Sequence, residues 1–532
     1  MIYIIVNKDR GVEFGRVKHE NPVKTASIYS LEEVTQEKVS HQLAAIVDEM
    51  EEVETQFSQQ VSRLHDNFKL SGSNLIHYLV LRSKEIREAQ EYLHHIGLSS
   101  LTNSESHTLS QVLNVLGWLN HTHDKLTTPV CDFETASKLR LIHAEQLLGV
   151  FPIQDRPHIM VTFSAELMQD RMLVEEMLNE GMSVARINCA HDNPEVWLNM
   201  IQVLKKAIAK TGKNCKVYMD LGGPKIRIRS IEARKKKECQ ELPVSEGKEL
   251  MLCAVPNAEA EVKRRKRRDR DILYVEPNEI ITMVNPGEHI YFDDGKFEAK
   301  VVEKANDYVL VKIVRISTKK PFLKPQKGIN LPDSDLLIPA LTEEDKSNIP
   351  FICQHADLVG YSFVSNPEDV ELLRNEINKY TIHHKPAIIL KIERLSAVQN
   401  LPSLIMNGMK DEAFGVMIAR GDLAVEIGFE RLSEIQEEIL WICEAAHVPV
   451  IWATQVLETL NKTGYATRSE ITDAAMGVKS ECVMLNKGRY IVKTIKTLDD
   501  ILTRQLGHVN KKRYIMRPLG IAKTFIQNQS HS

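Results

Sequence analysis

The chain has 532 residues, with 68 Lys and Arg against 72 Asp and Glu, so its formal net charge is −4. This near-neutral balance argues against a protein whose main role is to coat nucleic acid. No uncharged apolar run approaches the ~20 residues that span a bilayer. The length indicates about two to four domains. The eight cysteines are scattered singly, which fits neither a disulfide framework nor a zinc site. We therefore expect a soluble protein of the cytoplasm.

Residues 1–150 are expected to form a helical domain. Ser30-Leu31-Glu32-Glu33 matches a capping box, in which the Ser hydroxyl and the last Glu carboxylate bond to free backbone N–H groups. Further helices are expected around 74–96 and 107–120. After the capping box, apolar residues recur at alternating steps of four and three, which predicts a helix with one buried face. These residues are Val39, Leu43, Ile46, Met50, Val53 and Phe57.

From about residue 157, short apolar runs alternate with amphipathic helical segments. Near-continuous apolar strands that are each followed by a helix predict a parallel sheet covered by helices. Eight such units predict an α/β fold, a closed (β/α)8 TIM barrel, over 151–222 and 340–510, followed by a tail at 511–532. The expected strands are 158–164, 182–188, 216–221, 357–363, 387–393, 414–422, 448–455 and 482–487.

A long segment, residues 223–339, separates the third strand from its helix. It contains turn signals at Asn285-Pro286-Gly287 and Asp294-Gly295 and an alternating strand pattern at 308–316. Because long structureless loops are uncommon in compact domains, we expect an inserted β-rich lid domain here. The basic run at 263–268 favours a solvated loop, or a region that attracts anionic substrates, over a nucleic-acid site.

Polar residues gather at the carboxyl ends of the expected strands, where barrels of this kind carry their chemistry. Arg186 and Asn188 are two positions apart on one strand, so they project to the same face. The same spacing relates Lys391 and Glu393. Six successive strands end in polar residues. If these charges served only to pair with one another and close the barrel mouth, we would expect fewer of them, so we favour a functional site. The set comprises Arg186, Asn188, His191, Asp220, Lys225, Arg227, Ser362, Lys391, Glu393, Arg420, Gly421, Asp422 and Thr454.

These residue types suit a metal-dependent reaction of an anionic substrate. Glu393 and Asp422 follow adjacent strands and can ligate Mg²⁺, leaving coordination positions for water and substrate oxygens. Lys391, Arg186 and Arg227 would form a cationic clamp for a phosphoryl group or an enolate. A threonine hydroxyl at the seventh strand can relay a proton. The residues alone therefore predict a Mg²⁺-dependent barrel enzyme that acts on an anionic, phosphorylated substrate.

Eight segments, in order along about two-thirds of the chain, together resemble the signatures of the pyruvate kinase family. The resemblance implies transfer of a phosphoryl group from phosphoenolpyruvate to ADP, giving pyruvate and ATP, with Mg²⁺ or Mn²⁺ as cofactor. It also implies a barrel with a β-rich lid inserted after strand three. The segments are 184–191, 219–227, 291–295, 327–332, 390–393, 416–423, 453–458 and 466–470.

The resemblance further implies roles for individual residues. Lys391 would neutralise charge on the transferring phosphoryl group, and Glu393 and Asp422 would ligate the divalent metal. Arg186 and Arg227 would clamp phosphate. The backbone of Gly421 and Asp422 would bind the substrate carboxylate, and Ser362 would also bind substrate. The enolate would be protonated near Thr454. The nucleotide would be bound by His191, Lys327 and Asp294.

The chain departs from this pattern around the monovalent cation. Members that need K⁺ have Ser, Thr and Glu where this chain has Ala190, Leu221 and Lys225, whereas Asn188 and Asp220 are retained. A tethered ammonium can supply the positive charge of the ion. We therefore expect Lys225 to substitute for K⁺ beside a remnant site at Asn188 and Asp220, and we predict activity without K⁺.

Two other departures concern the ends of the chain. It resembles truncated, pyruvate-kinase-like variants of bacteria and plants, with an added N-terminal helical region and without the C-terminal domain that carries an effector site. This argues against sugar-phosphate regulation and the standard tetramer, and leaves a homodimer open. Two alternatives also stay open. One is a different Mg²⁺-dependent barrel enzyme that handles phosphoenolpyruvate or an enolate, and the other is a non-catalytic binding protein.

Overall fold

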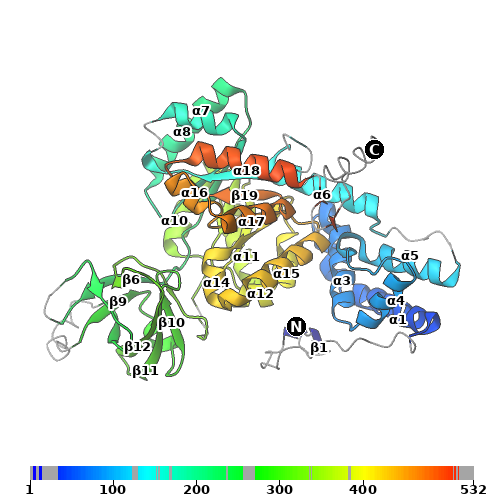
Figure 1. The fold of residues 1–532 in the computed structure, drawn as a ribbon, viewed down its shortest axis with the longest axis horizontal. Helices are drawn as coiled ribbons and strands as arrows, with labels where there is room; N and C mark the ends of the chain where they lie inside the picture. Colours follow the sequence, from blue (N-terminus) through cyan, green and yellow to red (C-terminus); the bar gives the residue numbers. More distant parts are fainter. Residues whose placement is uncertain are drawn as a thin grey trace, which may run out of the picture.

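The computed structural model describes residues 34–122, 130–150, 156–166, 170–234, 238–255, 270–334, 338–380 and 385–506, with a few short segments besides. The latter include the paired strands β1 (Ile4–Asn7) and β2 (Gly11–Phe14). The capping box at 30–33, the basic run at 263–268 and most of the tail lie outside the described residues. In Figure 1 the N-terminal helices lie on the right, the barrel in the centre and a β domain on the left.

The barrel predicted from the eight apolar runs is confirmed. Eight parallel strands close in the order β15-β16-β17-β18-β19-β3-β4-β5, and each expected run forms one of them. Their residues are buried almost throughout, which explains why the runs are apolar along their whole length rather than alternating. The strands are β3 (His158–Thr162), β4 (Met182–Asn188), β5 (Lys216–Asp220), β15 (Leu358–Tyr361), β16 (Ala387–Ile392), β17 (Phe414–Ala419), β18 (Val450–Ala453) and β19 (Cys482–Leu485).

Most of the strands end before the expected runs do, and the sixth is followed directly by a helix. The sixth run was expected to continue to Asp422, but β17 ends at Ala419 and helix α14 (Arg420–Ile427) begins at once. Asp422 therefore lies in the first turn of a helix, where its carboxylate is favoured by the helix dipole. This position moves the residue from the wall of the barrel to its rim.

Helices cover the outside of the barrel. Several begin with side-chain caps that are visible in the sequence: Asn193 and Asn366 each precede a proline and accept bonds from backbone N–H groups of the first turn. The covering helices are α7 (Arg171–Asn179), α8 (Pro194–Thr211), α10 (Glu343–His355), α11 (Pro367–Asn378), α12 (Leu395–Gln399), α13 (Leu401–Gly408), α15 (Leu432–Ala445), α16 (Glu458–Thr463), α17 (Arg468–Met476) and α18 (Ile491–Gln505).

The segment between β5 and α10 folds as a separate β domain with its own apolar core. Its seven-stranded sheet has the order β14-β10-β11-β12-β8-β9-β6, and a bridge from Arg227 to Gly328 brings its two edges together, so the sheet is nearly closed. The turn expected at Asp294-Gly295 joins β10 to β11. The strands are β6 (Arg227–Glu232), β8 (Glu249–Ala254), β9 (Ile272–Glu276), β10 (His289–Phe292), β11 (Phe297–Lys304), β12 (Tyr308–Ile316) and β14 (Ile329–Asn330).

The N-terminal helices follow the periodicity of the sequence. Helix α1 (Gln36–Gln56) buries Val39, Leu43, Ile46 and Met50 on one face, as predicted. It begins after Thr35, whose hydroxyl accepts a bond from the N–H of Lys38 at 3.2 Å. The other helices of this region are α3 (Lys69–Arg82), α4 (Arg87–His95), η3 (Glu105–His107), α5 (Thr108–Asn120) and α6 (Phe133–Leu148).

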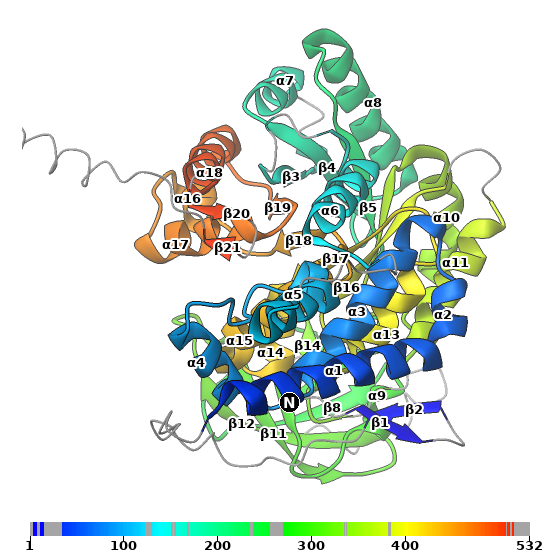
Figure 2. The same ribbon diagram turned by 90° about the vertical axis from the view of Figure 1, so that its right-hand side faces the viewer.

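These helices are joined to the barrel through buried polar contacts. Figure 2 shows α3 close to α15, and η3 also contacts α15. The amide of Asn74 on α3 donates bonds to the carbonyl oxygens of Glu105 at 2.7 Å and Ala445 at 2.8 Å, and its oxygen accepts the N–H of Thr108 at 2.8 Å. Because Asn74 is fully buried and fully paired, it fixes the position of α3 on the barrel.

Helix α6 closes one end of the barrel. Leu147 and Leu148 at its last turn belong to the apolar cluster inside the barrel, to which all eight strands contribute. Gly415 at the start of β17 allows this approach, because a Cβ there would lie 2.6 Å from Leu147. The opposite end, formed by the carboxyl ends of the strands, faces the β domain. Among the described helices, none is long and apolar enough to cross a membrane.

Acid should weaken the junction between the N-terminal helices and the barrel through His447. Its ring nitrogens contact the hydroxyl of Ser71 at 2.9 Å and the carbonyl of Ser106 at 2.8 Å. Burial lowers the pKa of His447 from 6.5 to about 4. The unfolded chain therefore takes up this proton at a higher pH than the folded chain. We predict that about 3 kcal/mol of unfolding free energy is lost as the pH falls from about 6.5 to about 4.

Urea unfolding at a series of pH values tests this prediction. His447→Asn, which cannot titrate and suits the positive φ of 50° at this position, should have a shallower pH dependence. The control is His94→Gln, at an exposed position on α4. Equal pH slopes for His447→Asn and wild type would contradict the prediction.

Candidate active site

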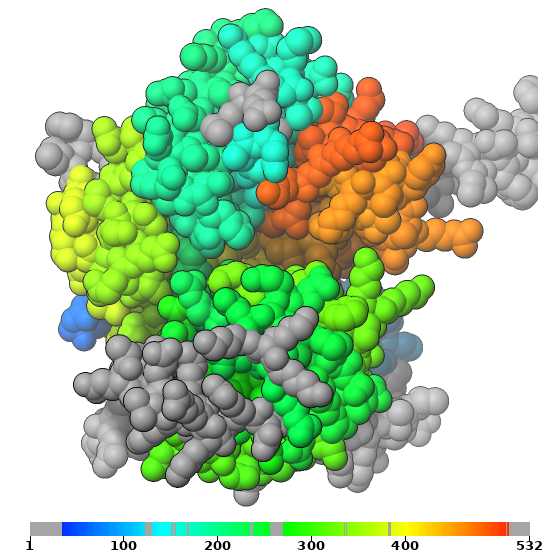
Figure 3. All heavy atoms as spheres, turned by 90° about the vertical axis from the view of Figure 1, so that its left-hand side faces the viewer, coloured from blue at the N-terminus to red at the C-terminus, as the bar shows by residue number. Residues whose placement is uncertain are grey.

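The carboxyl ends of the strands lie beneath the β domain. In Figure 3 the surface is hollowed between the β domain, in green, and the barrel units coloured cyan and orange. The segment from β5 to β6 enters the β domain from this end of the barrel, and β14 returns towards α14. Of the polar residues picked out in the sequence, those on or directly after β4, β5, β15 and β16 and those in α14 lie near one another here.

Asp220, at the end of β5, is the centre of this group. It is 1% exposed and pairs with two cations. Arg186 binds Oδ2 through Nη2 at 2.5 Å and Nε at 3.0 Å, and Lys391 Nζ lies 3.3 Å from Oδ1. Burial alone would raise the pKa of Asp220, but Lys391 and Arg186 outweigh it and lower the pKa below its usual value. Asp220 therefore stays ionised and holds both cations in place.

Lys391 on β16 is the second buried charge. Its ammonium donates a bond to Ser362 Oγ at 2.7 Å and lies 2.9 Å from Glu393 Oε1. Burial would lower the pKa of this lysine, but the carboxylates of Asp220 and Glu393 raise it overall. The result is a fixed, charged ammonium at a buried position, where a charge acts strongly on a nearby anion.

Glu393 and Asp422, the residues expected to ligate a metal, face different partners. Glu393 Oε2 accepts the N–H of Phe363 at 2.8 Å. Asp422 is held by Lys225, whose Nζ lies 2.9 Å from each carboxylate oxygen. Burial and the charge of Asp422 raise the pKa of Glu393. Burial would also raise the pKa of Asp422, but Lys225 lowers it overall.

This pair fits a hard divalent cation by its donor type. Both residues supply carboxylate oxygens that are largely shielded from solvent. The two negative charges repel each other, and a divalent cation would relieve this repulsion. Among the described residues no group of three or more His, Cys, Asp or Glu side chains has the arrangement of a closed metal site. Two carboxylates suffice for Mg²⁺, because that ion usually keeps several waters and substrate oxygens.

The expectation that Lys225 substitutes for K⁺ stays a prediction, and the structure shows which groups Lys225 contacts. Its ion pair is with Asp422, whereas Asp220 is neutralised by Arg186 and Lys391. Asn188 accepts the N–H of Ala190 at 3.1 Å. The positive charge next to the expected monovalent site thus comes from Arg186 and Lys391, and Lys225 stands beside the expected metal ligand.

Thr454 lies at the rim next to α14. Its hydroxyl oxygen is buried and has no hydrogen-bond partner in the part of the chain that the structure describes. A Cβ at Gly421 would lie 3.1 Å from this oxygen, so the two residues adjoin. The Thr454 carbonyl accepts a bond from Arg420 Nη2 at 2.6 Å. Arg420 also pairs with Asp473 and lies over the Trp452 ring at 4.4 Å, which fixes the strand end that carries Thr454.

The residues expected on the nucleotide side are more exposed. Burial, together with the positive charges of Arg227 and Lys487, lowers the pKa of His191. Arg227 Nη1 donates to the Gln326 carbonyl at 3.0 Å. Lys327 pairs with Asp293 at 2.8 Å rather than with Asp294, which is exposed in the turn after β10.

Sequence reasoning missed two site residues. Asn330 on β14 donates bonds to Asp422 Oδ1 at 3.4 Å and to Glu426 Oε1 at 3.1 Å. Burial raises the pKa of Glu426 to about 7. Glu426 could have been found, since it stands four residues after Asp422 and so shares its helix face. Asn330 belongs to the 327–332 segment, but nothing in the sequence shows that the return strand reaches α14.

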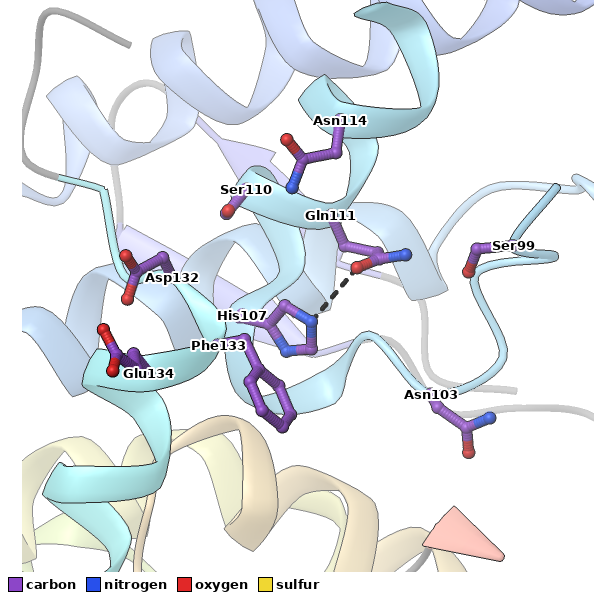
Figure 4. A pocket seen from close by; sticks show the side chains of 9 residues that line it. All are labelled: Ser99, Asn103, His107, Ser110, Gln111, Asn114, Asp132, Phe133 and Glu134. Atoms are coloured by element: carbon purple, nitrogen blue, oxygen red, sulfur yellow. Dashed lines mark hydrogen bonds between the residues drawn. The ribbon is translucent and has the colours of Figure 1, made fainter. Parts of the chain in front are cut away.

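A separate cavity of about 630 Å³ lies in the N-terminal helices (Figure 4). Its polar lining comes from the 99–103 loop, η3, α5 and the start of α6. His107 contacts Gln111 Oε1 through Nε2 at 3.1 Å. None of the residues expected in the active site lines this cavity, so it is distinct from the barrel mouth.

Comparisons with known proteins agree with the geometry. Residues 155–495 match the family described as pyruvate kinase, barrel domain. The pyruvate kinase of Hypocrea jecorina is 29% identical over 335 residues, which cover 62% of this chain and 58% of that protein. Pyruvate kinase 1 of Trypanosoma brucei brucei is 31% identical over 324 residues, or 60% of each chain. The pyruvate kinase of Bacillus licheniformis is 30% identical over 352 residues, covering 64% and 55%.

The fold and the site together define a (β/α)8 barrel protein with buried cations and carboxylates at its mouth and a β domain above it. With the match over most of the barrel, the chain belongs to the pyruvate kinase family. The aligned regions span about 55–60% of the length of these three relatives.

Gly360 on β15 should be essential for the packing around Asp220. A Cβ there would lie 1.9 Å from Tyr218 Oη and 2.5 Å from Asp220 Oδ1. We predict that Gly360→Ala loses about 1–3 kcal/mol of unfolding free energy, measured by urea denaturation, because the buried carboxylate must shift. The control is Gly222→Ala, where the nearest contact of a Cβ would be 3.5 Å. Equal losses in the two variants would contradict this account.

Proposed function

We propose that this protein is a phosphotransferase with pyruvate kinase activity, which transfers the phosphoryl group of phosphoenolpyruvate to ADP. The observation that carries the proposal is the buried Lys391 ammonium, held by Ser362, Asp220 and Glu393 at the barrel mouth. A charge this deeply buried is costly to keep unless it serves a ligand or completes a network. The family supports the choice of reaction.

Lys391 and Arg186 would act on the phosphoryl group. The P–O bond of phosphoenolpyruvate breaks while a bond forms to a terminal oxygen of ADP, and negative charge is spread over the transferring group. Lys391 is fixed by three contacts and Arg186 by Asp220, so neither has to reorganise when this charge develops. Ser362 would keep the ammonium aimed at the substrate.

Glu393 and Asp422 would hold Mg²⁺ or Mn²⁺. When bound, the divalent cation would supply Lewis-acid stabilisation of phosphate and enolate oxygens. The N–H groups of the first turn of α14, at Gly421 and Asp422, are free of helical partners and would bind the substrate carboxylate. In this arrangement the substrate carboxylate would lie at the rim and the phosphate would lie at the centre of the site.

Thr454 would serve the protonation step. After phosphoryl transfer the enolate of pyruvate takes a proton at its methylene carbon, which makes the overall reaction favourable. The buried Thr454 hydroxyl, without a partner among the described residues, is free to donate to the substrate or to relay a proton. On the more exposed side, His191 and Lys327 would bind the nucleotide, and Asp294 would lie with them on the β domain. Arg227 would clamp phosphate together with Arg186.

Lys391→Met should slow phosphoryl transfer strongly. Loss of a pre-organised positive charge beside the reacting phosphoryl group lowers kcat by about 10²–10³-fold or more. Pyruvate formation from phosphoenolpyruvate and ADP, followed in a coupled assay, measures it. The matched control is Lys479→Met. Lys479 is similarly shielded from solvent, its Nζ lies 2.9 Å from Glu437 Oε1, and this pair is far from the barrel mouth. Equal rates for Lys391→Met and wild type would reject the mechanism.

A wild-type protein that forms no pyruvate would favour the alternatives. Product analysis with phosphoenolpyruvate and a panel of nucleoside diphosphates distinguishes them. Consumption of phosphoenolpyruvate without a nucleoside triphosphate product indicates another enolate enzyme, and no consumption indicates a binding protein.

The reaction should not need K⁺. The positive charges of Arg186, Lys391 and Lys225 already balance the carboxylates at the mouth. We predict that replacing K⁺ by tetramethylammonium changes kcat/KM by no more than about twofold, because the fixed cations supply the field of the ion. The same coupled assay, run at constant ionic strength, measures the effect. A collapse of the rate in tetramethylammonium would contradict the prediction.

A further inference from the structure

The two chain segments that connect the β domain to the barrel meet at one carboxylate. Lys225 lies on the entering segment, between β5 and β6, and Asn330 lies on the returning strand β14. The two segments are bonded to each other, since the N–H of Ile329 donates to the carbonyl of Ile226 at 2.9 Å. Lys225 and Asn330 both contact Asp422 in the first turn of α14.

The contact with Lys225 takes up the whole carboxylate. Its ammonium lies 2.9 Å from Oδ1 and 2.9 Å from Oδ2 of Asp422, and the two side chains are only 22% and 16% exposed. Gly328 makes room for this lysine, because a Cβ there would lie 3.0 Å from Lys225 Cε. A larger residue at position 328 would push the lysine away. The ion pair therefore belongs to the two segments that connect the β domain to the barrel, which we call the hinge.

Asn330 strengthens the same junction. Its side-chain amide donates to Asp422 Oδ1 and to Glu426 Oε1, one helical turn further along α14. The hinge of the β domain is thus held against α14 by contacts that converge on the residue expected to ligate the divalent cation. The contacts of Lys225 and Asn330 with Asp422 use carboxylate oxygens that a metal ion would also need.

An ammonium and a divalent cation cannot share this carboxylate without cost. Both are positive, and a separation of a few ångströms in a site of low dielectric gives strong repulsion. Metal binding at Asp422 therefore requires Lys225 to withdraw from at least one oxygen. Since Lys225 belongs to the hinge, its withdrawal loosens the contact between the β domain and α14.

We propose that Lys225 is a built-in competitor of the divalent cation at Asp422, and that metal binding releases the hinge of the β domain from α14. The proposal rests on the role proposed above for Asp422 as a metal ligand. By reciprocity, whatever holds Lys225 on Asp422 weakens metal binding, and metal binding weakens the hold of the hinge on α14. Lys225 is therefore a positioning residue, because its ion pair with Asp422 holds the β domain against α14.

Direct titration with Mn²⁺, followed by electron paramagnetic resonance without substrate or nucleotide, tests the competition. Lys225→Met should bind Mn²⁺ at least about tenfold more tightly than wild type, because the variant lacks the ammonium that repels the metal ion. A tenfold change in the dissociation constant corresponds to about 1.4 kcal/mol. The matched control is Lys248→Met, because Lys248 lies in the β domain, is 25% exposed and pairs with Asp271 at 2.6 Å. It should bind Mn²⁺ as wild type does.

Amide hydrogen exchange tests the release of the hinge. Mn²⁺ should speed exchange at residues 226–231 and 328–331 in wild type, and Lys225→Met should already exchange faster there without metal. Unfolding in urea confirms that each variant is folded. Unchanged or weaker Mn²⁺ binding by Lys225→Met, or no metal effect on exchange, would overturn the proposal.

The outcome also separates this proposal from the proposed function. Wild type that binds Mn²⁺ with an affinity unaffected by Lys225 overturns the competition but leaves Asp422 as a metal ligand. Failure of both wild type and Lys225→Met to bind Mn²⁺ overturns both. Loss of binding in Asp422→Asn, with Lys225→Met still tight, supports both.

Discussion

The burial of Asp220 is the interaction on which the barrel mouth depends. A carboxylate that is 1% exposed is tolerated only when cations compensate it. Here Arg186 does so from the neighbouring strand β4, and Lys391 does so from β16, two strands away on the other side. The pairing fixes both cations in one orientation. Ser362 and Glu393 complete the network around Lys391, so each member of the site is held by the others.

The rest of the architecture keeps this network in place and leaves one side of it accessible. Leu147 and Leu148 of α6 seal the amino-terminal end of the barrel, and the N-terminal helices are tied to α15 by Asn74. The carboxyl-terminal end is covered by a separate domain that is connected through two short segments. Because those segments converge on Asp422, the position of the β domain and the charge at the rim are physically linked.

Much of the fold could be predicted because burial leaves a direct trace in the sequence. Strands that are covered on both faces have to be apolar along their length, so the runs at 182–188 and 387–393 were readable as barrel strands. The end of β17 could not be predicted from the sequence, because the residues that follow Ala419 can either continue a strand or begin a helix. Only the packing of α14 against its neighbours decides between the two.

The sequence by itself determined which chemical groups stand at the mouth, since strand ends in a barrel meet whatever their partners are. Only the tertiary structure decided how these groups pair. Lys225 is close in sequence to Asp220 but pairs with Asp422, nearly two hundred positions away, and Asn330 reaches the same carboxylate. Pairing of charges depends on distances of a few ångströms between segments remote in the chain, and local sequence carries no record of those distances.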